Sequence, residues 1–219
     1  MSNKEEEVPQ VGLLLDLSLR CTGWVVVRDE PLSEFPDGHF GLPWIAWGEI
    51  PLTDTTLSLH ERIGQLGLAL DVLLAKWKPV WIAAEMPAHA FAARGGKSVS
   101  NATSVIMQQR AFGATYLLTW LRGVPFLDVD PSLSKYATTG KPKADKKTVS
   151  WCLGTRFGVP VKRDGKFDWP KGATEAVRDA LAVTFYINNL RLIHGISWLD
   201  ICLAAQSKPP AQQWYEHAS

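Results

Sequence analysis

The chain contains 219 residues, of which 46% are hydrophobic and 21% are charged, and these proportions exclude disorder over most of its length. No apolar run reaches the roughly 18 residues of a membrane span, and the acidic start, MSNKEEE, lacks the apolar core of a secretory signal. The net charge of +1 hides an uneven distribution, because residues 1–90 carry 6 Lys and Arg against 13 Asp and Glu, whereas residues 131–178 carry 11 against 4.

Apolar runs alternating with helical periodicity predict one α/β domain over residues 11–195, between a flexible N-terminus, 1–10, and a C-terminal extension, 196–219. In chain order we expect strands at 11–17, 24–28 and 44–50, a helix at 56–77, a strand at 80–85, a helix at 101–121, a strand at 126–129, and helices at 131–138, 144–157 and 174–192. The basic, glycine-containing segment 91–100 is predicted to be a mobile loop.

The basic segment 131–178 has two interpretations. A concentration of positive charge in an otherwise acidic chain is typical of a surface that binds a polyanion such as nucleic acid. A solvated helical face rich in lysine explains the same charge equally well. The charge distribution alone does not separate these interpretations.

Two carboxylates stand in strongly apolar strands. Asp16 lies within the run VGLLLDL, and Glu85 closes the run VWIAAE. A buried carboxylate is costly unless it is paired or binds a metal. For one such acid, a cap or an arginine partner is the simpler explanation. Two of them on separate strands indicate a site, because the strand ends converge if the strands are neighbours.

Further carboxylates come from the last predicted helix. Glu175 and Asp179 are four residues apart, so they share one helix face and repel each other unless a cation lies between them. Together with Asp16 and Glu85 they form an all-oxygen set, which suits Mg²⁺ or Mn²⁺. With a polyanionic partner, this set favours two-metal phosphodiester hydrolysis.

Four segments of the chain resemble one known family. They are LDLSLRCTGW at 15–24, Ala84-Glu85, the basic stretch SKYATTG…ADKKTV at 134–149, and DALAV at 179–183. In this order and at this spacing they are similar to the motifs of the RuvC-type Holliday junction resolvases, within the ribonuclease H-like superfamily. The family usually has a second acid or a His three residues before the final Asp. This chain has Ala176 there, so Glu175 is taken as the fourth ligand.

The resemblance implies a ribonuclease H-like α/β fold with a central mixed five-stranded sheet flanked by helices. It implies a Mg²⁺-dependent endonuclease that resolves four-way DNA junctions in recombination and repair by paired symmetric nicks, leaving 5′-phosphate and 3′-hydroxyl ends. Two ions per site, for which Mn²⁺ can substitute, are assigned to Asp16, Glu85, Asp179 and Glu175, and no small-molecule cofactor is expected. The expected location is the cytoplasm of a bacterium or a phage-infected cell.

The resemblance also assigns DNA contacts. Lys135 and Lys146 match the two functional lysines of the family and are expected to contact phosphates at the scissile bond, and Phe91 matches its base-stacking aromatic residue. The other expected DNA contacts are Arg94, Lys97, Lys141, Lys143 and Lys147. Gly23 is expected where the backbone and DNA approach closely.

Paired cuts on a two-fold symmetric junction imply a homodimer. The helix at 101–121 carries Met107, Phe112, Tyr116 and Trp120, which form either the dimer interface or part of the core of a monomer.

Three other functions compete with junction resolution. A broader flap- or branch-cleaving nuclease of the same fold would carry identical acids and differ only in substrate preference. A non-catalytic nucleic-acid binder would gain nothing from its buried acids. An actin-like kinase would use the segment from Asp16 to Gly23 at a phosphate, but it needs a duplicated domain that this chain lacks.

Overall fold

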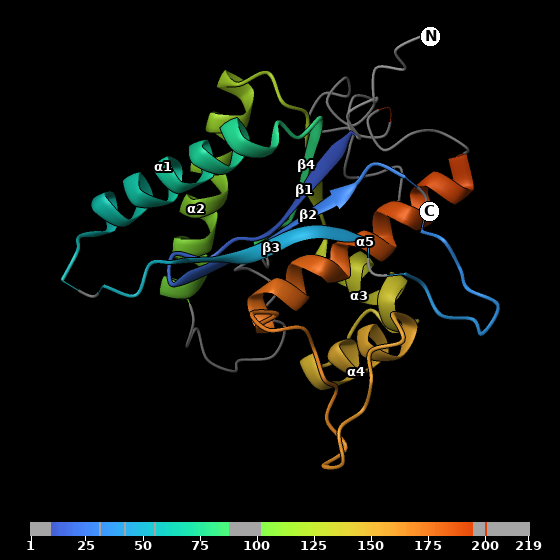
Figure 1. The fold of residues 1–219 in the computed structure, drawn as a ribbon. Helices are drawn as coiled ribbons and strands as arrows, with labels where there is room; N and C mark the ends of the chain where they lie inside the picture. The colour runs from blue at the N-terminus through green and yellow to red at the C-terminus, as the bar shows by residue number, and fades with distance from the viewer. Residues whose placement is uncertain are drawn as a thin grey trace, which may run out of the picture.

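The computed structural model describes residues 10–30, 32–41, 43–54, 56–87, 102–194 and 200. In these ranges the elements are β1 (Val11–Asp16), β2 (Cys21–Arg28), β3 (Trp44–Pro51), α1 (Leu59–Trp77), β4 (Trp81–Glu85), α2 (Ala102–Leu121), β5 (Phe126–Val129), α3 (Pro131–Thr139), α4 (Lys146–Arg156) and α5 (Glu175–His194) (Figure 1). None of the described helices has the length and hydropathy of a transmembrane span.

The strands form one mixed five-stranded sheet in the order β3-β2-β1-β4-β5. β1 pairs antiparallel with β2 and parallel with β4, and β5 continues the parallel side. β1 and β4 are therefore neighbours whose carboxyl ends meet at the same edge of the sheet. The α/β fold predicted from the sequence is confirmed.

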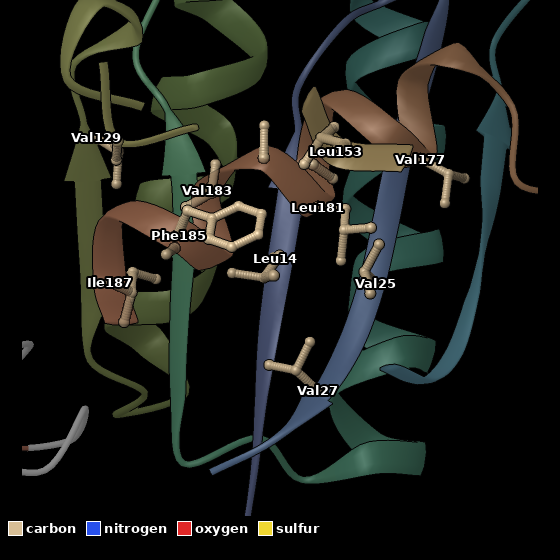
Figure 2. Packing of buried hydrophobic residues seen from close by; sticks show 14 of the residues in the cluster. Leu14, Val25, Val27, Val129, Leu153, Val177, Leu181, Val183, Phe185 and Ile187 are labelled. Carbon is tan, nitrogen blue, oxygen red and sulfur yellow. The ribbon is translucent and has the colours of Figure 1, made fainter. Parts of the chain in front are cut away.

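Helices cover both faces of the sheet, α1 and α2 on one face and α3, α4 and α5 on the other (Figure 1). Leu14 faces the α5 side, where it packs with Leu181 and Phe185 (Figure 2). Leu13 and Leu15 face the α1 side. Burial on both faces explains why β1 is a continuous apolar run rather than an alternating one.

Local capping chemistry sets the helix starts. Ser58 forms a capping box with Glu61, so α1 begins at Leu59 rather than at the predicted residue 56. Asp145 accepts a hydrogen bond from the Thr148 amide and begins α4 two residues later than predicted. Asp130 caps α3 in the same way, with its side chain accepting a hydrogen bond from the Ser132 amide.

The position of Gly23 corrects one expectation. A Cβ atom built at Gly23 would lie 2.2 Å from the backbone oxygen of Ala176, in the first turn of α5. The missing side chain therefore makes room for α5 against β2, and the expectation that it makes room for DNA is wrong. The sequence showed that a close approach was needed there, but not which backbone approaches.

We expect Gly23→Ala to lower the free energy of unfolding by about 3 kcal/mol, because the obstructing atoms belong to backbone that cannot rotate away. Gly64→Ala is the matched control, since a Cβ there meets nothing within 4 Å in the middle of α1; this change should stabilise the protein by roughly 0.5–1 kcal/mol. Urea unfolding of both variants measures the difference. Equal stabilities would contradict the tight contact between β2 and α5.

Candidate active site

Strand geometry brings Asp16 and Glu85 together. The parallel register aligns Leu15 with Ala84, so the two acids occupy the next positions on neighbouring strands. Side chains alternate along a strand, and Leu14 and Ala83 face α5. Asp16 and Glu85, two residues further on, therefore face α5 as well, which is the side that carries Asp179.

The negative charges of Asp16, Glu85 and Asp179 act on one another, and these three residues are called the acid cluster below. The pKa of Asp16 is raised to about 7, first by burial and then by the negative charge of Asp179, with Lys146 acting in the opposite direction. The pKa of Glu85 is also raised to about 7, mainly by burial; the Ser134 hydroxyl and Lys135 lower it, and Asp16 and Asp179 raise it. The cluster therefore holds its full negative charge only with a compensating cation.

Lys146 is the cation that lies between the two acids of α5. Its Nζ donates hydrogen bonds to Glu175 Oε1 at 2.5 Å and to Asp179 Oδ2 at 3.0 Å. Burial raises the pKa of Asp179, and Lys146 partly offsets that rise. Glu175 has a side chain that is 64% exposed, and its pKa is lowered by the lysine. The ion pair accounts for Glu175 without a metal, so its role as fourth ligand stays a prediction.

The other predicted contacts are placed as follows. Lys135, on α3, lies close enough to Glu85 to lower its pKa, at the same edge of the sheet as the acids. Lys141, Lys143 and Lys147 are exposed around the start of α4. The remaining predicted DNA contacts lie outside the described residues: Phe91, Arg94 and Lys97.

Sequence reasoning missed one connection that positions α5. The register places Asp16, Gly23 and Glu49 in one row across three strands. Thr174 Oγ1 donates a 2.5 Å hydrogen bond to Glu49 Oε1, and this ties β3 to the residue before α5. The Cys21 thiol also bonds to Glu49; burial and this contact raise its pKa to about 11. No local signal predicts a contact between residues 125 positions apart.

The donor set fits a hard divalent cation, because all its atoms are carboxylate oxygens and their charges repel in a buried setting. Over the described residues, no three His, Cys, Asp or Glu side chains are drawn close enough to form a ready metal site. The positive charge at this edge comes from Lys146 and Lys135. The chemistry of the donors thus suits a hard divalent cation, whereas their spacing in this structure does not bring three of them together.

A mixed five-stranded sheet with acids at the ends of its first and fourth strands and on a helix packed across them defines the ribonuclease H-like fold. No family model matches the chain. The crossover junction endodeoxyribonuclease RuvC of Nitratidesulfovibrio vulgaris is 25% identical over 178 residues, which are 81% of this chain and 90% of that protein. The predicted resemblance to the RuvC-type resolvases is therefore confirmed.

Solved structures show the same fold. Thermus thermophilus RuvC matches with a TM-score of 0.58 and 20% identity, over 86% of this chain and 98% of its own. The same enzyme in complex with a Holliday junction substrate matches with a TM-score of 0.59 and 19% identity, over the same shares of the two chains. The yeast mitochondrial Holliday junction resolvase Ydc2 matches with a TM-score of 0.55 and 14% identity, over 94% of this chain and 85% of its own.

Proposed function

We propose that this protein is a DNA endonuclease that resolves four-way junctions by paired symmetric nicks. The observation that carries the proposal is the cluster of Asp16, Glu85 and Asp179 at one edge of the sheet. It lies in a fold shared with a resolvase that was solved with a Holliday junction. The curated relative is named as a crossover junction endodeoxyribonuclease, and the match covers 81% of this chain and 90% of that protein.

In this proposal, Asp16, Glu85 and Asp179 hold two Mg²⁺ ions, with Glu175 as the fourth ligand. The chemistry that such ions supply is Lewis acidity toward water and the phosphodiester, which gives 5′-phosphate and 3′-hydroxyl ends. The chain itself supplies the fixed acids, and Lys135 and Lys146 bind the flanking phosphates. An ammonium suits that role because it is a compact charge on a flexible stem.

A junction endonuclease that cuts opposing strands needs two active sites, so we propose a homodimer. The four large side chains of α2 that are candidates for its interface fall into two pairs. Met107 and Phe112 pack against the core, whereas Tyr116 and Trp120 are exposed, Trp120 at 71%. Leu117 and Leu121 are exposed beside them. The C-terminal half of α2 is the part of the helix that is open to a second copy of the chain.

We expect the double change Leu117→Glu and Leu121→Glu to convert the dimer to a monomer, because buried unpaired charge is costly at an interface. Sedimentation velocity measures the mass in solution. The monomer should still nick one strand of a junction but lose the paired cuts. A variant that stays dimeric would place the interface elsewhere, and a monomeric wild type would remove the dimer from the proposal.

The experiment that tests the function compares labelled substrates in Mg²⁺: a four-way junction, a flap, a three-way branch, linear duplex and single strand. Symmetric paired nicks confined to the junction are expected. Equal or faster cleavage of flaps and branches would instead assign a broader branch nuclease. Binding of the junction without cleavage of any substrate, in Mg²⁺ or Mn²⁺, would identify a non-catalytic binder.

A further inference from the structure

A hollow of about 550 Å³ opens directly beside the acid cluster. It lies between α4, the loop 158–174 and the start of α5, and Figure 1 shows this loop in orange beside α4. Glu175, Asp179 and Lys146 line one end of the hollow. The rest of its wall is aromatic and basic, and its main contributors are Trp151, Phe167, Trp169, Lys147, Lys166 and Arg178.

The loop is held firmly in place. Val161 and Phe167 form a β-bridge, and a turn at Gly165, with φ of +79°, closes the hairpin between them. Phe167 lies on α4 at Gly154, where a Cβ atom would come within 2.6 Å of its ring. The Lys162–Asp168 ion pair, at 3.0 Å, joins the two arms of the hairpin. This wall of the hollow is therefore a built structure.

The aromatic lining is partly fixed and partly open. The Trp169 ring lies against Trp44, with centroids 6.3 Å apart, and the Arg178 guanidinium lies 5.7 Å from the Trp169 ring. Trp151 is 61% exposed on α4. An exposed indole beside fixed aromatic and cationic groups offers a flat apolar face to a ligand.

The lining is complementary to one kind of ligand. Nucleobases stack on aromatic side chains whatever their sequence, and cations along such a groove bind the phosphates. Lys147 and Arg178 supply positive charge here, and Lys166, paired with Asp164 at 3.2 Å, adds to it. The hollow also shares Asp179 and Lys146 with the acid cluster, so DNA bound at the acids passes its mouth.

We propose that this hollow receives an unpaired nucleotide of the DNA strand that is being cut, next to the scissile phosphate. Its base stacks on Trp151 and its phosphate contacts Lys147. The proposal rests on the proposed endonuclease function, because the acids place the strand at the mouth of the hollow. It gives the protein a base-binding site on the α4 side of the acids, separate from the one assigned to Phe91.

The first test measures binding without cleavage. A fluorescein-labelled single strand of eight thymidines is titrated with wild type, Trp151→Ala, Trp151→Phe and Phe35→Ala, all without divalent metal. Phe35 is a matched control, since it is an aromatic residue with 55% exposure on a loop away from the hollow. The Trp151→Ala variant should bind the strand roughly tenfold more weakly than wild type, because it loses base stacking. Trp151→Phe should retain most of the affinity, and Phe35→Ala all of it.

The second test locates the nucleotide. Junctions carry a single abasic site at each of the two positions on either side of the cut, and kcat/KM is measured for wild type and Trp151→Ala. At one position the abasic site should slow wild type roughly tenfold and leave Trp151→Ala no slower than on the intact junction. This loss of additivity is a result that a merely structural role for Trp151 would not produce.

The outcomes separate the two proposals. If the Trp151→Ala variant binds the single strand and cleaves junctions as well as wild type does, the nucleotide site is overturned and the endonuclease function stands. Weakened binding of the single strand by Trp151→Ala alone, in a protein that cuts no junction, would support the nucleotide site and overturn the endonuclease. Equal weakening by Trp151→Ala and Phe35→Ala would also overturn the nucleotide site.

Discussion

Asp16→Asn should abolish cleavage of a four-way junction, lowering the single-turnover rate by on the order of 10³-fold or more. Asp16 belongs to the acid cluster, and burial and the charge of Asp179 raise its pKa to about 7. A neutral amide cannot hold the divalent cations that stabilise the transition state of phosphodiester hydrolysis by several kcal/mol. A 10³-fold lower rate corresponds to a loss of about 4 kcal/mol of this stabilisation. Junction binding should persist, because the basic residues are unchanged.

Asp128→Asn is the matched control for this change. Asp128 is also a largely buried acid with a raised pKa, and it lies one strand away from Glu85, on β5. Asp128 lies two residues after Phe126 and so faces the same side of the sheet, the side covered by α1 and α2. Its side chain therefore points away from the acid cluster. This variant should cleave at nearly the wild-type rate. If both variants lost activity equally, the assignment of the site to the α5 side would be wrong.

The fold was predictable because its main signals are local. Two-sided burial makes β1 and β4 continuous apolar runs, and helix starts depend on caps such as Asp130 and Asp145. The acids stood out for the same reason, since Asp16 interrupts an apolar run. That β1 and β4 are neighbours was not a local signal. The sequence left it as a condition for a shared site, and the parallel register shows that the condition is met.

The connections around the acids could not be predicted, because they join distant parts of the chain. The sequence indicated that Glu175 and Asp179 need a cation, but only the packing of α4 against α5 identifies it as Lys146. The bond between Thr174 and Glu49 depends on the register of β3, which the sequence does not specify. The hollow beside the cluster likewise depends on how the loop 158–174 folds back on α4.

The stability of the metal-free protein should fall as the pH rises from 5 to 8. Asp16 and Glu85 both have pKa values raised to about 7, mainly by burial. In this window the unfolded chain has already lost those protons, whereas the folded protein still holds them and loses them as the pH rises. The folded state thus binds more protons than the unfolded state, so the free energy of unfolding decreases with pH, here by at least about 2 kcal/mol.

Mg²⁺ should reverse this loss at pH 8 and have little effect at pH 5, because protons occupy the acids at the lower pH. A hundredfold excess of the ion over its dissociation constant would stabilise the protein by about 2.7 kcal/mol. Urea unfolding at both pH values, with EDTA or Mg²⁺, measures both effects.

The double variant Asp16→Asn, Glu85→Gln isolates the contribution of these two acids, since it removes the two carboxylates whose pKa values are raised to about 7. Its free energy of unfolding should change little between pH 5 and 8, and Mg²⁺ should not stabilise it at pH 8. If the free energy of unfolding falls equally with pH in wild type and in the double variant, Asp16 and Glu85 are not the source of the pH dependence. If Mg²⁺ stabilises both proteins equally, the ion binds outside the cluster, and the two-metal mechanism loses its site.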